Sequence, residues 1–231
     1  SCVSIVGLLP AACVGVDIGQ LRAGMAAFLD HSLTAEVDEN QAAQGAAFNA
    51  RHYYAGRNIH VIMAYADRLW KTASWCRQLI SESLGKDGRG MTPLAALGTV
   101  DQHSMLQLML GGGDDRYYTL ITTPHAGAGP VVDKALAEQV GLGYLGGKPI
   151  GDVMEAFQQG TIGSLQAAGR PLRCIHLPRV DAYHVGALLM AWMVEVILTA
   201  SLVGVNAFDQ PAVEDSKWRA KHILGHDASS A

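Results

Sequence analysis

Residues 59–65 read Ile59-His60-Val61-Ile62-Met63-Ala64-Tyr65, a short run that is apolar on both of the faces that a strand presents. Strands buried in a parallel sheet have this composition, because helices cover both sides of such a sheet. A helical pattern follows from Asp67 to about Leu84 and stops at Gly85, a residue that often ends helices. A strand followed directly by a helix predicts a crossover unit of an α/β fold.

The same alternation continues along the chain. Segments 117–122 and 172–177 have the composition of a second and a third strand, and either 93–97 or 144–145 is a candidate short edge strand. Helices are expected at 8–14, 18–31, 41–54, 131–140 and 150–168, with Asp38 or Asn40 capping the third of them. We therefore predict a three-layer α/β sandwich with a mostly parallel sheet and long C-terminal helices. Ligands of such sheets bind at the carboxyl ends of the strands, where we expect a crevice.

Composition excludes several classes of protein. Apolar residues make up 49% of the 231 residues and charged residues only 16%, as in a globular protein with a large core. A net charge of −4 and no basic stripe argue against nucleic-acid binding. The four cysteines are far apart, which predicts reduced thiols of a cytoplasmic protein. No pair of histidines has metal-ligand spacing with carboxylates, so no metal site is expected.

One segment, 185–205, is apolar enough to resemble a membrane span. Glu195 lies near its middle, and a carboxylate at the centre of a bilayer costs about 2–3 kcal/mol or more. The first residues of the chain have no cationic region or cleavage site typical of a signal peptide. We expect a buried central helix that begins at Asp181, and no membrane partner.

The polar stretch Phe208-Asp209-Gln210-Pro211-Ala212-Val213-Glu214-Asp215-Ser216-Lys217 follows that helix. Pro211 suits the first turn of a new helix, and Asp209 or Asn206 is a suitable cap. Lys217 lies one turn beyond Val213, so burial of Val213 would hold the lysine in one place. The pattern alone is more typical of an ordinary capped surface helix than of a catalytic one.

Four segments resemble the phosphoglucose isomerase family, and they occur in the order found in that family. Residues 200–203 with 208–217 are similar to its C-terminal signature, and residues 4–10 to the tail of its other signature. Residues 78–86 resemble the segment that carries its catalytic glutamate, and residues 98–104 the bacterial form of its catalytic-histidine loop. Together the four segments span nearly the whole chain.

The resemblance implies a fold and an activity. Residues 1–231 would be the C-terminal sugar-isomerase (SIS) type subdomain of a two-subdomain enzyme. That enzyme interconverts glucose 6-phosphate and fructose 6-phosphate through an enediol, without a cofactor, in glycolysis and gluconeogenesis. The Ser/Thr-rich phosphate loop and the Gly-Gly-Arg arginine of the family would precede Ser1 and are not in this sequence. We therefore expect the isolated chain to be inactive.

The resemblance also implies which side chains act. Glu82 would be the base, and Gln78, one turn earlier on the same helical face, would bind a sugar hydroxyl. His103 would open the sugar ring in the active site of a partner subunit, which implies a homodimer. Lys217 would stabilise developing negative charge, and Gln210 would lie near the sugar phosphate.

Other interpretations remain open. In isolation, Glu82 is also typical of a solvated glutamate near a helix end, and His103 of a polar residue at a helix start. The chain could also be a non-catalytic, regulatory SIS domain that binds sugar phosphates, or the isomerase part of a transaldolase–isomerase fusion. Retention of Glu82, His103 and Lys217 together favours an enzyme, because a binding domain has no need of all three.

Overall fold

A parallel sheet forms the centre of the molecule. The computed structural model describes residues 2–225, and within them the sheet has four strands in the order β2-β1-β3-β4. All neighbouring strands are parallel, as predicted. The strands are β1 (Ile59–Ala64), β2 (Thr92–Leu97), β3 (Arg116–Thr122) and β4 (Leu172–His176).

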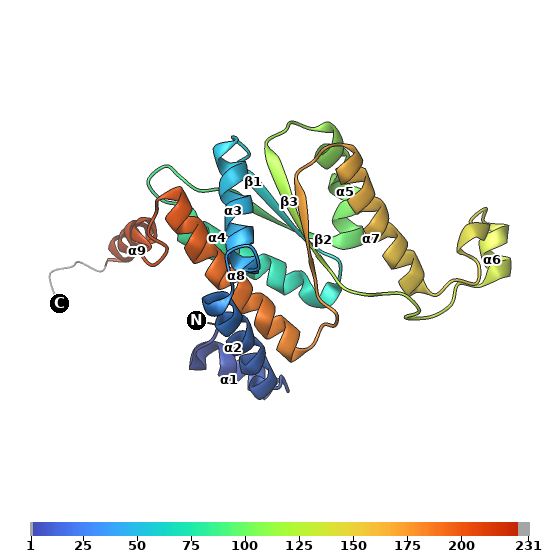
Figure 1. Cartoon of the computed structure of the whole chain (residues 1–231), viewed down its shortest axis with the longest axis horizontal. Helices are drawn as coiled ribbons and strands as arrows, with labels where there is room; N and C mark the ends of the chain where they lie inside the picture. Colours follow the sequence, from blue (N-terminus) through green and yellow to red (C-terminus); the bar gives the residue numbers. More distant parts are fainter. Residues whose placement is uncertain (1, 226–231) are drawn as a thin grey trace.

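Helices cover both faces of the sheet, which gives the predicted three layers (Figure 1). On one face lie α3 (Gln41–Tyr54), α4 (Trp70–Leu84) and α8 (Ala182–Val203), and on the other α5 (Gly98–Gly111) and α7 (Ile150–Ala167). The alternation along β1 explains this arrangement. Ile62 and Ala64 pack with α4 and α8, whereas Val61 and Met63 pack with α5 and α7.

Of the two candidate edge strands, one is confirmed and the other is wrong. Segment 93–97 is confirmed as a strand, because it lies inside β2, which pairs with β1 along its whole length. Segment 144–145 instead belongs to a short 3-10 turn, η2 (Gly143–Leu145), outside the sheet. A brief 3-10 turn, η1 (Asp67–Leu69), also precedes α4 at the start of the helix predicted from Asp67.

The apolar helix α8 forms part of the core. By length and composition it could cross a membrane. Eight of its residues, however, are buried inside the described part of the chain, including Trp192 and Glu195. Asp181 caps it, accepting a hydrogen bond from the backbone N–H of His184 at 2.9 Å. The N-terminal helix α2 (Ile18–Thr34) packs along α8, and α1 (Ile5–Cys13) lies beside α2.

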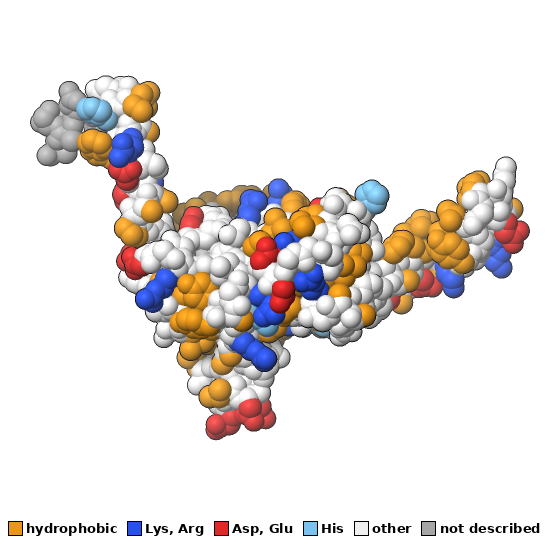
Figure 2. Space-filling view, turned by 90° about the horizontal axis from the view of Figure 1, so that it is seen from above, with side chains coloured by type: hydrophobic (Ala, Val, Ile, Leu, Met, Phe, Trp, Pro, Cys, Tyr) orange, Lys and Arg blue, Asp and Glu red, His pale blue; other side chains and the backbone are white. Residues whose placement is uncertain are grey.

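Two segments project from this body in opposite directions (Figure 1). One is the arm, residues 127–149, which contains α6 (Lys134–Gln139) and η2 and precedes α7. The other is α9 (Pro211–Ile223), which follows α8 after a turn at residues 204–210. Figure 2 shows both as extensions of the molecular surface.

Candidate functional site

The C-terminal half of α4 presents two polar side chains on one face. Gln78 and Glu82 are one helical turn apart, and Gln78 Nε2 donates a hydrogen bond to Glu82 Oε1 at 3.0 Å. The opposite side of α4 is buried through Cys76, Ile80 and Leu84, which fixes the direction in which the polar pair points. The predicted shared face of Gln78 and Glu82 is therefore confirmed.

A groove, which we call the α4 groove, runs past this pair. It consists of two cavities of about 550 Å³ and 400 Å³ that share Glu82 and Gln210. The larger lies between α1, α4 and α8, with Gln78 on its wall. The smaller lies between the end of α4 and the first turn of α9. The groove thus brings together three of the predicted site residues, Gln78, Glu82 and Gln210.

The α4 groove is not at the carboxyl ends of the strands, so that expectation is wrong for Glu82. A crossover helix between parallel strands runs back along the sheet, so its C-terminus returns to the edge where the next strand begins. Glu82 is near the end of α4, shortly before β2 starts at Thr92. It therefore lies toward the amino ends of the strands.

His103 lies elsewhere. It is an exposed residue in α5, which begins directly after β2 and covers the other face of the sheet. Among the described residues, those that line the α4 groove do not include it. His103 is thus exposed at the surface of its own chain, and its role in the active site of a partner subunit stays a prediction.

Lys217 also lies outside the lining of the groove that the structure describes. Its ammonium group pairs with Glu214 at 2.7 Å, and its side chain is 61% exposed. This pairing lowers the pKa of the Glu214 carboxyl. Val213 does line the groove but remains partly exposed, so it does not anchor the lysine by burial. A catalytic position for Lys217 stays a prediction.

The cap of α9 differs from the expectation. The N-cap residue is Gln210, and its side chain makes no capping hydrogen bond. Asn206 Oδ1 instead accepts from the backbone N–H of Phe208 at 3.0 Å, and Asp209 pairs with Lys86 at 3.0 Å. Both predicted caps are thus used in the turn before the helix. The contact with Lys86 was missed, because the two residues are far apart in sequence.

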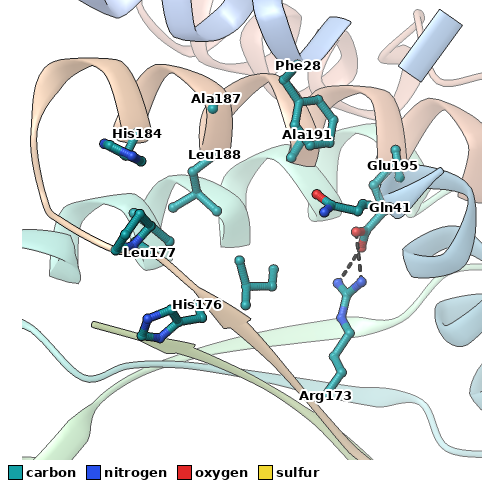
Figure 3. Close-up of a pocket in the computed structure, with 13 residues that line it drawn as sticks. Phe28, Gln41, Arg173, His176, Leu177, His184, Ala187, Leu188, Ala191 and Glu195 are labelled. Atoms are coloured by element: carbon teal, nitrogen blue, oxygen red, sulfur yellow. Dashed lines mark hydrogen bonds and ion pairs between the residues drawn. The ribbon is translucent and has the colours of Figure 1, made fainter. Parts of the chain in front are cut away.

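A separate cavity, of about 170 Å³, lies between α2, α8 and the end of β4 (Figure 3). At one end Arg173 forms a two-pronged ion pair with Glu195, at 2.9 Å and 2.5 Å. Asn49 Nδ2 also donates to Glu195 Oε1, at 2.8 Å. Glu195 is thus a paired carboxylate in the core, and this cavity shares no lining residue with the α4 groove.

Comparisons with known proteins confirm the resemblance seen in the four segments. The chain is 40% identical over 218 residues to the glucose-6-phosphate isomerase of Rubrobacter xylanophilus, covering 94% of this chain and 50% of the relative. It is 43% identical over 226 residues to a probable glucose-6-phosphate isomerase of Natronomonas pharaonis, covering 97% and 52%. The chain therefore spans about half the length of the curated relatives it matches. No family model matches it.

Solved structures agree on the fold. A hypothetical protein of Thermus thermophilus superposes with a TM-score of 0.88 at 32% identity, covering 96% of this chain and 54% of that one. A glucose-6-phosphate isomerase of Chlamydia trachomatis superposes with a TM-score of 0.79 at 20% identity, covering 97% and 46%. At that identity the second likeness concerns the fold alone.

Proposed function

We propose that these 231 residues form the part of a glucose-6-phosphate isomerase that carries its acid–base side chains. The complete enzyme would interconvert glucose 6-phosphate and fructose 6-phosphate in the cytoplasm, in glycolysis and gluconeogenesis. The observation that carries the proposal is the α4 groove. In a chain similar to these isomerases over nearly its whole length, it brings together the glutamate and the two glutamines that the resemblance assigns to the site.

Aldose–ketose isomerisation moves one proton between two neighbouring carbons. Glu82 would take the C2 proton of open-chain glucose 6-phosphate, giving an enediol, and return it to C1 to give fructose 6-phosphate. The hydrogen bond from Gln78 would hold the carboxylate in one orientation during both transfers. Glu82 is exposed in this chain, so the remaining half of the enzyme would have to cover it.

The other two assigned residues would act at the sugar ring. Lys217 would approach once substrate and the remaining half of the enzyme close over α9, and would stabilise negative charge on oxygen. For this it would have to leave Glu214. His103 would open the ring of a substrate bound by a second copy of the chain.

The arm supports the proposed homodimer. It stands away from the body, and Figure 2 shows hydrophobic side chains gathered along it. Its large apolar residues are mostly in water: Val131 is 61% exposed, Leu136 60% and Tyr144 70%. A projecting segment of this kind gains stability when a partner covers it. A second copy, which the shared use of His103 requires, would be that partner.

The test is an assay of the protein made from the complete open reading frame that contains these residues. It should convert fructose 6-phosphate to glucose 6-phosphate, and in deuterated water it should exchange the transferred proton. Glu82→Gln should abolish both while leaving sugar-phosphate binding largely intact, since an amide keeps the shape but is no base. The exposed control Glu39→Gln should behave as wild type. An unchanged rate in Glu82→Gln would refute the assignment.

A further inference from the structure

Helix α9 has little packing of its own to fix its orientation. None of its residues, all of which the structure describes, is buried. Only its first turn, through Pro211, Ala212 and Val213, lines the smaller cavity of the α4 groove. The helix then stands away from the body of the molecule (Figures 1 and 2). Its direction therefore depends on the turn at residues 204–210 that precedes it.

Lys86 holds this turn. It follows Glu82 by four positions, just beyond Gly85 at the end of α4. Its ammonium group donates to the backbone carbonyl of Asn206 and pairs with Asp209 at 3.0 Å. The lysine side chain is only 7% exposed, whereas its two partners, Asn206 and Asp209, are exposed residues.

Arg89, from the same loop, holds the start of the turn. Its Nη1 donates to the carbonyl of Val203 at 2.8 Å and to that of Gly204 at 3.0 Å. These are carbonyls at the C-terminus of α8, where the helix dipole favours a cation. Gly204 has φ +79°, a backbone conformation in which the chain turns away from the helix. The loop after α4 thus contacts the turn at both ends.

The position of the Lys86 contacts matters because Asp209, which pairs with Lys86, directly precedes Gln210. Gln210 is the N-cap residue of α9 and lines both cavities of the groove with Glu82. The loop after α4 and the segment that leads into α9 therefore meet at one ammonium group. A charge-assisted hydrogen bond is stronger than a neutral one, so the ammonium group of Lys86 is the strongest link between these two segments.

We propose that Lys86 is a positioning residue that fixes the turn at residues 204–210, and through it Gln210 and α9, relative to Glu82. The proposed effect of Lys86 on the position of the turn concerns this chain alone; we call it the mechanical part of the proposal. The effect on catalysis rests on the proposed isomerase function, in which Glu82, Gln210 and Lys217 have to meet one substrate.

Hydrogen exchange of the 231-residue chain tests the mechanical part. Lys86→Met keeps the length of the side chain and removes the charge. Amide exchange in residues 205–217 should rise by roughly tenfold or more, the factor that one charge-assisted hydrogen bond contributes to a local opening. Exchange in β1 and β3 should not change. Lys86→Arg should restore most of the protection, and Lys71→Met, which changes an exposed lysine at the start of α4, should have no effect.

A second variant covers the case in which Lys86→Met fails to fold. Asp209 is 53% exposed, so Asp209→Ala should leave the core intact. It removes one of the two partners of Lys86 and should give a smaller rise in exchange over the same residues. If exchange in 205–217 matches wild type in Asp209→Ala, and in Lys86→Met where that variant folds, the proposal is overturned.

Activity of the complete protein separates this proposal from the proposed function. Lys86→Met should lower kcat/KM for fructose 6-phosphate by roughly tenfold or more, with recovery in Lys86→Arg. If the wild type does not isomerise sugar phosphates but exchange still rises in Lys86→Met, the proposed function fails and the positioning role stands. If the wild type is active and Lys86→Met changes neither exchange nor kcat/KM, the positioning role fails alone.

Discussion

Gln78 Nε2 lies 3.0 Å from Glu82 Oε1, so an amide one helical turn earlier holds an oxygen of the proposed base. An exposed glutamate at the end of a helix otherwise samples several rotamers. The hydrogen bond favours one of these rotamers. Because the amide is uncharged, it does not offset the negative charge of the carboxylate, whereas a lysine or arginine partner would. The pair therefore combines a fixed direction with a group that is still able to accept a proton.

From this pair we predict that Gln78→Met lowers the kcat of the complete protein by about 10- to 100-fold. A hydrogen bond to a charged group contributes about 1.5–3 kcal/mol, and 1.4 kcal/mol corresponds to a factor of about ten in rate. Steady-state assays with fructose 6-phosphate measure the effect. Gln166→Met, at an exposed position on α7, is the matched control and should keep wild-type kcat. Equal rates for the two variants would show that the amide has no role.

We also predict that the 231-residue chain alone gives little or no isomerisation. Binding of the remote phosphate positions the carbons of the sugar against the base, and the phosphate loop that the family resemblance describes is not in this sequence. A coupled assay of the purified chain, run beside the complete protein at equal concentration, measures this. Robust turnover by the chain would show that these 231 residues hold everything the reaction needs.

Much of the fold can be predicted from local pattern. The strand β1 and the helix after it are recognisable from the sequence. A short run that is apolar on both faces, followed by apolar residues at helical spacing, fits few arrangements other than a buried strand and a helix. The strand β2 remains one of two options, since Thr92–Leu97 is short and contains a proline and two alanines. Its pairing with β1 depends on tertiary contacts that no local pattern contains.

The site is less predictable, for reasons of distance along the chain. The pair of Gln78 and Glu82 follows from helical spacing. The contact of Lys86 with Asp209 joins segments more than a hundred residues apart, and neither residue signals the other. The buried ion pair of Arg173 and Glu195 was missed too, although a single carboxylate in a long apolar helix is a visible signal that a cation has to be near.

For that ion pair we predict strong coupling. Glu195→Leu should lower the free energy of unfolding by about 3–5 kcal/mol, because it leaves the Arg173 charge unpaired beside the core. Arg173→Met combined with Glu195→Leu should recover most of the loss, since two apolar side chains need no partner. Urea denaturation of the four proteins in a double-mutant cycle measures this. If the two losses simply add, the side chains do not depend on each other.

The last prediction concerns acid and His60, which is fully buried in β1. Its Nε2 lies 2.8 Å from Thr119 Oγ1, and its ring stacks on Tyr117 with centroids 4.3 Å apart. Burial, and then the charge of Arg173, hold the pKa of His60 well below its ordinary value of 6.5. The unfolded chain therefore binds a proton near pH 6.5 that the folded chain does not bind, so stability falls as the pH falls.

As the pH falls below about 6.5, the slope of this loss approaches about 1.4 kcal/mol per pH unit for His60. His52, whose pKa burial also lowers, adds to it. His60→Gln should reduce the pH dependence of the unfolding free energy by about one proton over this range, measured by urea denaturation at several pH values. Thr119→Val, which removes the hydroxyl partner but keeps the histidine, should lower stability at every pH and retain the slope. A slope in His60→Gln as steep as in wild type would mean that His60 is not the group responsible.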